Sequence, residues 1–329
     1  MAAFRTRLWP RCGFPKNAAS LNNLQRRHYA LEANDFEGML KQKSLWETFP
    51  DHIQKLAVFH ARANNYQIPL ISKAAAGGLD QKKAYHVAAA IRQLREMNGE
   101  IAAGRKIGFT NNALRKQYSI DASNWSYVYR NTVVDIPAEG LKEGKSVLAN
   151  ISHLSQLEPK IEPEIIFGLK QPIQSTMNDV EMLECVDWIA HGFEIVASIF
   201  PGWKFTAADT TAAFALHGLL LVGPPMQLAG HSQNSGALLE NLPSFNVELY
   251  RNGQMEDSGT GSNVLGSPLN ALRHLAELLE KDDHNQPLQA GEIITTGTLT
   301  KASSIKNGDT WSTKLRGIDL PGLNVTFRV

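Results

Sequence analysis

The stretch "PKIEPEIIFGLK", residues 159–170, places two acids inside an apolar run. Glu162 and Glu164 lie two positions apart, with isoleucine and phenylalanine following them. In a β-strand, side chains at positions i and i+2 point to the same face, so both carboxylates face one side. Like charges at that spacing repel, and burying them costs free energy unless a positive group lies opposite. The stretch therefore predicts a buried strand whose two acids share a positive partner.

A third acid has a similar setting. Glu194 lies in "HGFEIVASI", where we expect it at the start of an apolar strand. A local lysine or arginine is the usual partner of one buried glutamate, but we expect the nearby Lys160 and Lys204 at the surface. Carboxylate oxygens are the ligands that Mg²⁺ and Mn²⁺ prefer. The residues alone leave two interpretations open: local ion pairs, or a metal site formed by Glu162, Glu164 and Glu194.

The composition is that of an ordinary soluble protein. The 329 residues are 43% hydrophobic and 20% charged with a net charge of +1, which suits one large or two modest domains. A near-neutral charge does not support a nucleic-acid partner, and the longest apolar run is too short to span a membrane. Two cysteines, Cys12 and Cys185, make a disulfide scaffold unexpected and favour a reducing compartment.

The first thirty residues differ from the rest of the chain. They are rich in arginine and contain serine, and no acid precedes Glu32, which is typical of an organelle transit peptide. The sequence "RRHY" before Ala30 resembles a matrix-protease cleavage site, so we expect a mitochondrial matrix protein. The alternative is a disordered basic tail on a cytoplasmic protein. We expect a presequence over 1–30, a helical N-terminal region over 31–105 and a metal-binding, β-rich catalytic core over 106–329.

Helical patterns come first along the chain, and strand patterns dominate after residue 106. The stretches "AYHVAAAIRQLREMNG", "DVEMLECVDWIAHG" and "SPLNALRHLAELLEK" predict helices, the last with Ser267 as N-cap and Pro268 in the first turn. Strands are predicted in "RKIGFT", "EPEIIFGL", "FEIVASIF", "EIITTGTL" and "LNVTFRV". Helices and strands do not alternate regularly, so the expected class is α+β.

Other motifs in the sequence do not predict a functional site. The ten histidines show no His-Glu-x-x-His spacing, so zinc is not expected. The stretch "GTGSNVLG" lacks phosphate-loop spacing, and with no clear strand before it we interpret it as a turn into the Ser267 cap. We expect structural roles for Cys185, which has no basic neighbour, and for His217, as a hydrogen-bonded core residue.

Several motifs together resemble one family. In order they are "GRKIGFT" (104–110), "EPEIIFGL" (162–169), "HGFEIVAS" (191–198) and "GSNVLGSPLNAL", which begins at residue 261. The chain resembles the 2-hydroxypentadienoate hydratase / 4-oxalocrotonate decarboxylase branch of the fumarylacetoacetate hydrolase superfamily, over roughly residues 55 to 329. The resemblance implies a rolled, mixed β-core of the fumarylacetoacetate hydrolase C-terminal type with a small helical N-terminal part. It also implies a homo-oligomer.

The resemblance assigns roles to individual residues. It implies that Glu162, Glu164 and Glu194 hold Mg²⁺ or Mn²⁺ and that Lys106 of "KIG" lies in the active site. A small 2-oxo acid, or its dienol, would chelate the metal through its carboxylate and 2-oxygen, and the metal would stabilise the enolate. Water addition then makes a hydratase, with decarboxylase and tautomerase as alternatives on the same intermediate. Lys106 would shuttle a proton or hold the substrate carboxylate, as a lysine made less basic by burial and the metal.

Two departures from the family pattern bear on the pocket. Asn124 stands where hydratases have an aspartate and decarboxylases an apolar residue, and Asn cannot take a proton. The stretch "DTTAAFALHG" keeps Asp209 but loses later polar residues, for which Thr210 or His217 could substitute. The candidate catalytic residues are therefore Lys106, Asn124 and Asp209. A non-catalytic partner subunit is a further alternative, and C–C hydrolysis is disfavoured because no Glu-His pair that could activate water is evident.

Overall fold

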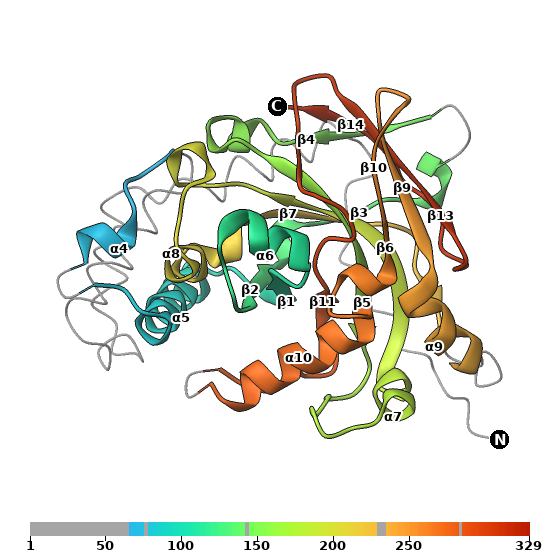
Figure 1. Cartoon of the computed structure of the whole chain (residues 1–329), viewed down its shortest axis with the longest axis horizontal. Helices are drawn as coiled ribbons and strands as arrows, with labels where there is room; N and C mark the ends of the chain where they lie inside the picture. The colour runs from blue at the N-terminus through green and yellow to red at the C-terminus, as the bar shows by residue number, and fades with distance from the viewer. Residues whose placement is uncertain (1–65, 76–77, 142–144, 229–234, 283–284) are drawn as a thin grey trace. The chain divides into compact units, whose positions relative to one another are not determined.

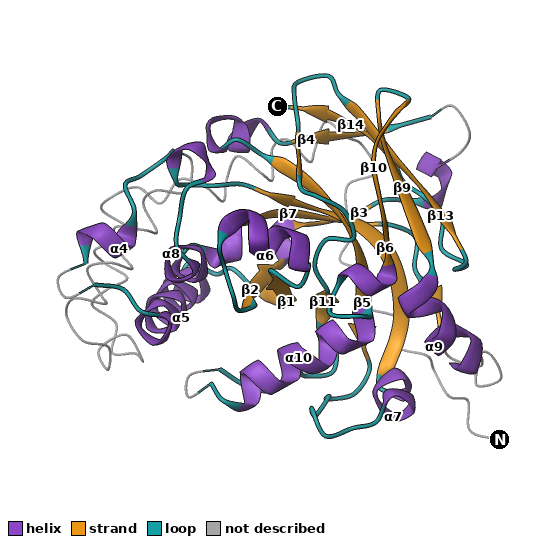
Figure 2. Cartoon of the chain, viewed as in Figure 1, coloured by secondary structure: helices purple, strands orange, loops and turns teal. Residues whose placement is uncertain are grey.

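The computed structural model describes residues 66–75, 78–141, 145–228, 235–282 and 285–329. All of these belong to one compact unit. The predicted presequence, residues 1–30, lies outside the described residues, as do residues 31–65 of the predicted helical region. The helices and strands that follow are labelled in Figure 1 and coloured by type in Figure 2.

Seven α-helices are found in the described part of the chain. They are α4 (Ile71–Ala74), α5 (Gln81–Met97), α6 (Asn112–Tyr118), α7 (Asp179–Glu184), α8 (Ala207–Ala212), α9 (Ser235–Ser244) and α10 (Pro268–Glu280). The predicted caps of α10 are present, because the Ser267 side chain accepts a hydrogen bond from the Leu269 amide and Pro268 occupies the first turn.

The strands form two mixed sheets. The larger sheet has the order β2-β1-β11-β5-β6-β7-β3, with β12 beside β5 and β8 beside β6, and the smaller has the order β10-β9-β13-β14-β4. Strands β1 to β7 are β1 (Ala102–Gly108), β2 (Asn124–Tyr129), β3 (Val133–Asp135), β4 (Val147–Asn150), β5 (Lys160–Leu169), β6 (Val186–Val196) and β7 (His217–Val222). The others are β8 (Met226–Gln227), β9 (Asn246–Arg251), β10 (Gln254–Thr260), β11 (Ile293–Thr295), β12 (Ser303–Ser304), β13 (Thr310–Arg316) and β14 (Asn324–Arg328). Mixed sheets with separate helices confirm the predicted α+β class.

The long, curved pair β5–β6 forms the middle of the larger sheet (Figure 1). Successive β5 residues contact different apolar clusters: Ile165 and Phe167 pack in the main core, whereas Ile166 packs in a small cluster. That cluster contains Val128, Ile166, Ala190, Leu220 and Val222. Since side chains alternate along a strand, Glu162 and Glu164 share the face of Ile166. The two acids therefore extend the small apolar cluster toward one end of the sheet.

The helices cover the sheets through apolar faces. Six of the buried α10 residues join the main core cluster: Leu269, Ala271, Leu272, Leu275, Ala276 and Leu279. The helix α5 buries the face predicted from its spacing, including Val87, Ile91 and Leu94, and ends at Met97 with Asn98 as its C-cap. It contacts α8, so the described part of the predicted N-terminal region packs within the same unit as the strands.

The sequence prediction is wrong for residues 186–192. The helix expected over "DVEMLECVDWIAHG" ends at Glu184, and Val186 begins strand β6. The local spacing fits the apolar face of a helix formed by Met182, Leu183, Val186 and Ile189. Pairing of β6 with β5 at ten positions overrides that local pattern. As a consequence Glu194 lies near the end of β6, not at the start of a strand. The strand β10 also precedes "GTGSNVLG", where none was expected.

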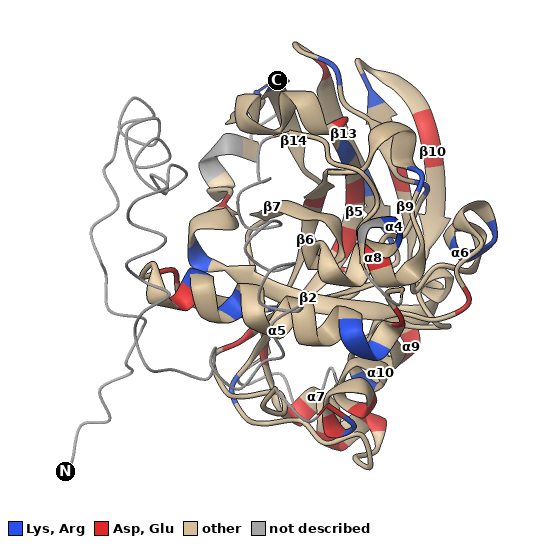
Figure 3. Ribbon diagram, turned by 90° about the vertical axis from the view of Figure 1, so that its left-hand side faces the viewer, with Lys and Arg blue, Asp and Glu red and all other residues tan. Residues whose placement is uncertain are grey.

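Charged residues of both signs occur along α5 and around α10 and α7, and acidic segments also appear on β5 within the sheet (Figure 3). Among the described residues, no helix combines the length and the apolar character needed to cross a bilayer. The acids inside the sheet are therefore the charge feature that needs a local explanation.

Candidate metal centre

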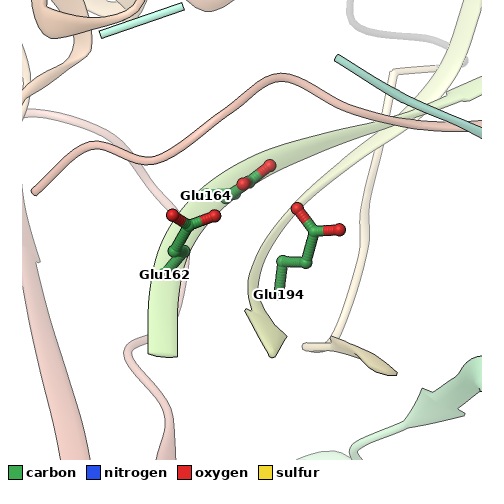
Figure 4. A group of neighbouring side chains, drawn as sticks. All are labelled: Glu162, Glu164 and Glu194. Atoms are coloured by element: carbon green, nitrogen blue, oxygen red, sulfur yellow. The ribbon is translucent and has the colours of Figure 1, made fainter. Parts of the chain in front are cut away.

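Three glutamates from two neighbouring strands point into one space (Figure 4). Glu162 of β5 pairs directly with Glu194 of β6, and Glu164 pairs with Gly192. One carboxylate oxygen from each of the three lies within 4.8 Å of the others. Glu164 and Glu194 are fully buried, and Glu162 is partly buried. The predicted metal-ligand trio is thus brought together by the antiparallel register of one strand pair.

The fixed partners of Glu164 come from the last residue of β11 and from the segment that follows it. Its Oε2 accepts hydrogen bonds from the Thr295 hydroxyl and, at 2.8 Å, from the Gly297 amide. Gly297 has a φ of +97°, and a Cβ there would come within 1.9 Å of the Thr110 hydroxyl, so glycine is required. The other oxygen of Glu164, Oε1, is buried with no hydrogen-bond partner. One oxygen is therefore held in place while the other is free for a ligand.

Lys106 is the cation within this acidic cluster. Its side chain is 3% exposed, and its Nζ lies 3.1 Å from Glu194 Oε2 and donates to the Ala215 carbonyl at 2.8 Å. The contact with Oε2 is an ion pair without hydrogen-bond alignment, so that oxygen also lacks a hydrogen-bond partner. Ala215 lies in a turn, Phe214–Leu216, whose three residues all have positive φ (56°, 47° and 63°). Such backbone costs free energy for residues other than glycine, and it presents the carbonyl to Lys106.

The pKa values of the cluster move in opposite directions. Burial raises the pKa of Glu162 to about 7, although Lys106 acts against it. Burial, together with Glu194 and Glu162, also raises the pKa of Glu164 well above its usual value. For Glu194 burial has the same tendency, but Lys106 and His217 outweigh it and its pKa is lowered. Burial tends to lower the pKa of Lys106, but the three carboxylates outweigh burial and raise it. The lysine is therefore more basic in the metal-free site, and a lysine made less basic beside a bound metal stays a prediction.

The donor set fits a divalent hard cation. Three carboxylates face one ammonium group, so the cluster keeps excess negative charge or retains protons. Glu164 Oε1 is buried with no hydrogen-bond partner, which is costly unless another group binds it, and Glu194 Oε2 has only the ion pair with Lys106. Oxygen-only ligands of this kind suit Mg²⁺ or Mn²⁺. Glu162, Glu164 and Glu194 are the residues that would hold such an ion.

Two histidines fix the strands around the site. The His217 Nδ1–H donates to Glu194 Oε1 at 2.7 Å, and Nε2 lies 2.8 Å from the Thr132 hydroxyl. His191 Nδ1–H donates to the Glu164 carbonyl, and its Nε2 accepts from Thr313 of the smaller sheet. Burial lowers the pKa of both rings, that of His191 to about 4. A Glu-His pair is thus present, contrary to the sequence interpretation, but both His217 nitrogens are engaged.

The other two predicted catalytic residues differ in their surroundings. Asn124 of β2 is buried, and its Nδ2 donates to Thr210 and Thr211 while its Oδ1 has no partner. A Cβ on Gly108 would lie 2.8 Å from that Oδ1 and 3.6 Å from Lys106 Nζ, so Asn124 borders the site. Asp209 instead forms the capping box of α8. Its catalytic role stays a prediction, and its contacts are those of a structural residue.

A pocket adjoins the carboxylates. The space between its walls, counted together with open solvent at its mouth, is about 460 Å³. Lys106, Glu162 and Gly297 line it at the acidic end. Its other described walls are largely apolar and aromatic, and neither Asn124 nor Asp209 is among them. The predicted substrate site thus opens directly onto Glu162 and Lys106.

Sequence reasoning did not identify Thr295, Gly297 or His217 as partners of the acids. Thr295 and Gly297 lie in "EIITTGTL", predicted only as a strand. For His217 a signal was available, because it is an ionisable residue directly before the apolar run "GLLLV".

Known proteins resemble the chain both in sequence and in structure. It is 27% identical over 246 residues to 2-hydroxyhexa-2,4-dienoate hydratase of Comamonas testosteroni, covering 74% of this chain and 85% of that protein. It is 27% identical over 237 residues to 2-keto-4-pentenoate hydratase of Paraburkholderia xenovorans (strain LB400), covering 71% and 80%. The structure of 4-oxalocrotonate decarboxylase from Pseudomonas putida G7, complexed with magnesium and adipate, aligns with a TM-score of 0.72 at 22% identity. That alignment covers 84% of this chain and 97% of the decarboxylase, and it shows the shared fold.

The match to a family covers more than half of the chain. A family model described as fumarylacetoacetate (FAA) hydrolase C-terminal matches residues 126–324, which include all three glutamates of the candidate metal centre. The mixed sheets and the fold alignment agree with this match and confirm the resemblance inferred from the motifs. The chain belongs to the fumarylacetoacetate hydrolase C-terminal family.

Proposed function

We propose that this protein is a divalent-metal-dependent lyase of the 2-keto-4-pentenoate hydratase type, which adds water to an unsaturated 2-oxo acid or its 2-hydroxydienoic form. The observation that carries the proposal is the cluster of Glu162, Glu164 and Glu194 around Lys106, at the end of a pocket. The hydratases named above, at 27% identity over most of their length, support the reaction class.

The metal is proposed to be Mg²⁺ or Mn²⁺. Held by the three glutamates, it would supply a Lewis acid for the negative charge that develops on the substrate's 2-oxygen. The chemistry of the oxygen ligands supports this choice, and a related fold has been solved with magnesium.

The chain's own residues have separable tasks in this proposal. Hydration of a 2-hydroxydienoic acid needs proton transfers on the carbon chain and the addition of one water. Lys106 borders the pocket beside Glu162 and carries protons that it can hold or pass on. Asn124 cannot accept a proton, but its unpartnered Oδ1 can accept a hydrogen bond from a water. Glu194, held ionised by Lys106 and His217, keeps the lysine oriented.

Decarboxylation of a 2-oxo acid is the second candidate, and Asn124 favours it. Loss of CO₂ needs no residue that activates water, and Asn124, which borders the site, is an amide that cannot accept a proton. A tautomerase would use the same proton transfers but would neither add water nor release CO₂.

Product analysis separates these reactions. The full chain is incubated with Mg²⁺ and freshly formed 2-hydroxypenta-2,4-dienoate, while loss of the dienol absorbance, NMR of the products and CO₂ release are recorded. We expect a 4-hydroxy-2-oxo acid. Release of CO₂ from a dicarboxylic analogue would favour the decarboxylase, and ketonisation alone the tautomerase. A protein that binds metal but changes none of these substrates would be the non-catalytic alternative.

The variant Lys106→Met tests the role of the lysine. We expect kcat/KM to fall by about 10²-fold or more, the range of a lost proton-transfer group, while metal affinity is retained. Lys204→Met is the matched control, because Lys204 is exposed on a loop. Equal kcat/KM values in Lys106→Met and Lys204→Met would remove Lys106 from the mechanism.

Location and assembly are part of the proposal. The arginine-rich residues 1–30 support import into mitochondria, with a homo-oligomer as the working form. A C-terminal fluorescent fusion of the full chain, compared with one that lacks residues 1–30, tests the location. Sedimentation of the purified chain tests the assembly.

A further inference from the structure

Four aromatic side chains form one wall of the pocket. They come from segments other than the two strands that carry the three glutamates. Phe109 follows β1, Tyr118 ends α6, and Trp203 and Phe205 lie in the connection between β6 and α8. All four are only partly buried. Partly exposed aromatic rings that line the same pocket as Lys106 and Glu162 offer apolar surface to whatever that pocket binds.

The rings hold one another in place. Tyr118 stacks on Phe205, with centroids 5.2 Å apart and planes at 27°, and it also packs against Trp203 and Phe109 at 6.2 Å. The Trp203 indole N–H donates to the Glu158 carbonyl at 3.0 Å. The Trp203 backbone has a φ of 55°, which is uncommon for a non-glycine residue and marks a fixed turn. We call Phe109, Tyr118, Trp203 and Phe205 the aromatic wall.

Cations near the pocket are already engaged. Lys106 is the one cation among the described lining residues, and it contacts Glu194 and the Ala215 carbonyl. Lys160, which we expected at the surface, donates to the Tyr118 hydroxyl at 3.0 Å and lies 3.9 Å from the Trp203 ring centroid. A second carboxylate on the substrate would therefore meet aromatic carbon and lose water, with no free cation on the described lining.

We propose that the aromatic wall is a subsite for the far end of the substrate, and that this end is apolar. The substrate class would be monocarboxylic 2-oxo acids with a conjugated alkenyl or aryl tail, in contrast to dicarboxylic ones. The inference rests on the proposed function, because the acid end must bind at the metal centre for the tail to reach the wall. Flat, unsaturated tails stack on such rings and bury apolar area.

Binding of a set of 2-oxo acids tests the inference. The full chain, saturated with Mg²⁺, is titrated calorimetrically with pyruvate, with 2-oxo-4-phenylbut-3-enoate and with 2-oxoglutarate. We expect the aryl acid to bind at least tenfold more tightly than pyruvate, and 2-oxoglutarate to bind no better than pyruvate. The same titrations without Mg²⁺ should show weakened binding of all three.

Two variants locate the effect. Phe205→Ala and Trp203→Ala should each weaken binding of the aryl acid at least fivefold and leave the dissociation constant of pyruvate within about twofold. Tyr250→Leu removes an aromatic ring from β9, outside the pocket lining, and should change neither constant. Circular dichroism of each variant checks the fold, and the unchanged pyruvate constant shows that the acid end of the site is intact.

The contrary outcomes are distinguishable. If none of the acids binds with Mg²⁺ to the folded chain, the proposed function fails. If pyruvate binds and the aryl acid binds no better, the function stands and the apolar subsite is wrong. If 2-oxoglutarate binds most tightly and Lys160→Met removes that preference, the subsite is anionic and the inference is overturned.

Discussion

Two buried acidic regions of this protein differ in whether all of their carboxylate oxygens accept hydrogen bonds. Asp209 uses both oxygens: Oδ1 accepts from the Ser72 amide, and Oδ2 accepts from the Ser72 hydroxyl and from the amide and hydroxyl of Thr206. At the metal centre, Glu164 and Glu194 are equally buried, but each has one oxygen without a hydrogen-bond partner. Asp209 joins α4 to α8, whereas the glutamates keep oxygen atoms available to a ligand.

The comparison teaches that burial alone does not separate a structural acid from a functional one. A buried carboxylate surrounded by donors stabilises the fold, because its desolvation is offset locally. Three carboxylates within 4.8 Å of one another with incomplete partners destabilise the metal-free fold. Lys106 can offset only one of the three carboxylate charges, so the arrangement favours binding of a further positive group.

The largest expected effect comes from Glu164→Gln. The glutamine can still accept from the Gly297 amide, but it removes one ligand charge. We expect kcat/KM for dienol hydration to fall about 10³-fold, equivalent to about 4 kcal/mol. The thermal midpoint of the metal-free protein should stay the same or rise, because the glutamine oxygen keeps the Gly297 hydrogen bond and the amide is neutral at every pH. A large drop in that midpoint would instead make Glu164 a structural acid like Asp209.

The next effect is on stability and comes from Asp209→Asn. The new amide group would place donors against the donors of Ser72 and Thr206. We expect the free energy of unfolding in urea to fall by about 2–3 kcal/mol. Mg²⁺ affinity of the folded variant should be unchanged. Lost turnover at undiminished stability would support the catalytic role that the sequence predicted for Asp209.

The smallest effect is a pH dependence of metal binding. Burial raises the pKa of Glu162 to about 7, so this carboxyl is mostly ionised at pH 8 and mostly protonated at pH 6. Mg²⁺ must displace that proton, so its affinity should fall as the pH falls, by about tenfold from pH 8 to pH 6. Calorimetric dissociation constants at pH 6, 7 and 8 measure it. If the affinity for Mg²⁺ stayed constant over this range, Glu162 would not be a metal ligand with a raised pKa.

Part of this site could be predicted from sequence because it depends on local patterns. The spacing of Glu162 and Glu164 on a strand needs only the alternation of side chains. The apolar setting of Glu194 indicated it as a third acid, and the resemblance supplied Lys106 as their companion. The helix α10 was predicted with its cap because Ser267 and Pro268 are strong local signals.

The remainder depends on tertiary structure. Thr295 and Gly297 reach Glu164 because β11 lies between β1 and β5, an order that no local pattern encodes. The first part of β6, residues 186–192, was predicted as a helix for the same reason, since its partner β5 decides its conformation. The aromatic wall joins residues almost a hundred positions apart in sequence, such as Phe109 and Phe205.

The most direct test of the central claim is calorimetric titration of the chelator-treated full chain with Mg²⁺ or Mn²⁺ at pH 8. We predict one divalent ion per chain in the native protein and in Asp209→Asn, and none at the same concentrations in Glu164→Gln. Proton release on binding should be larger at pH 6 than at pH 8, because Glu162 is already mostly ionised at pH 8. A folded native chain that takes up no ion, or a Glu164→Gln variant that binds as well as the native chain, would contradict the account.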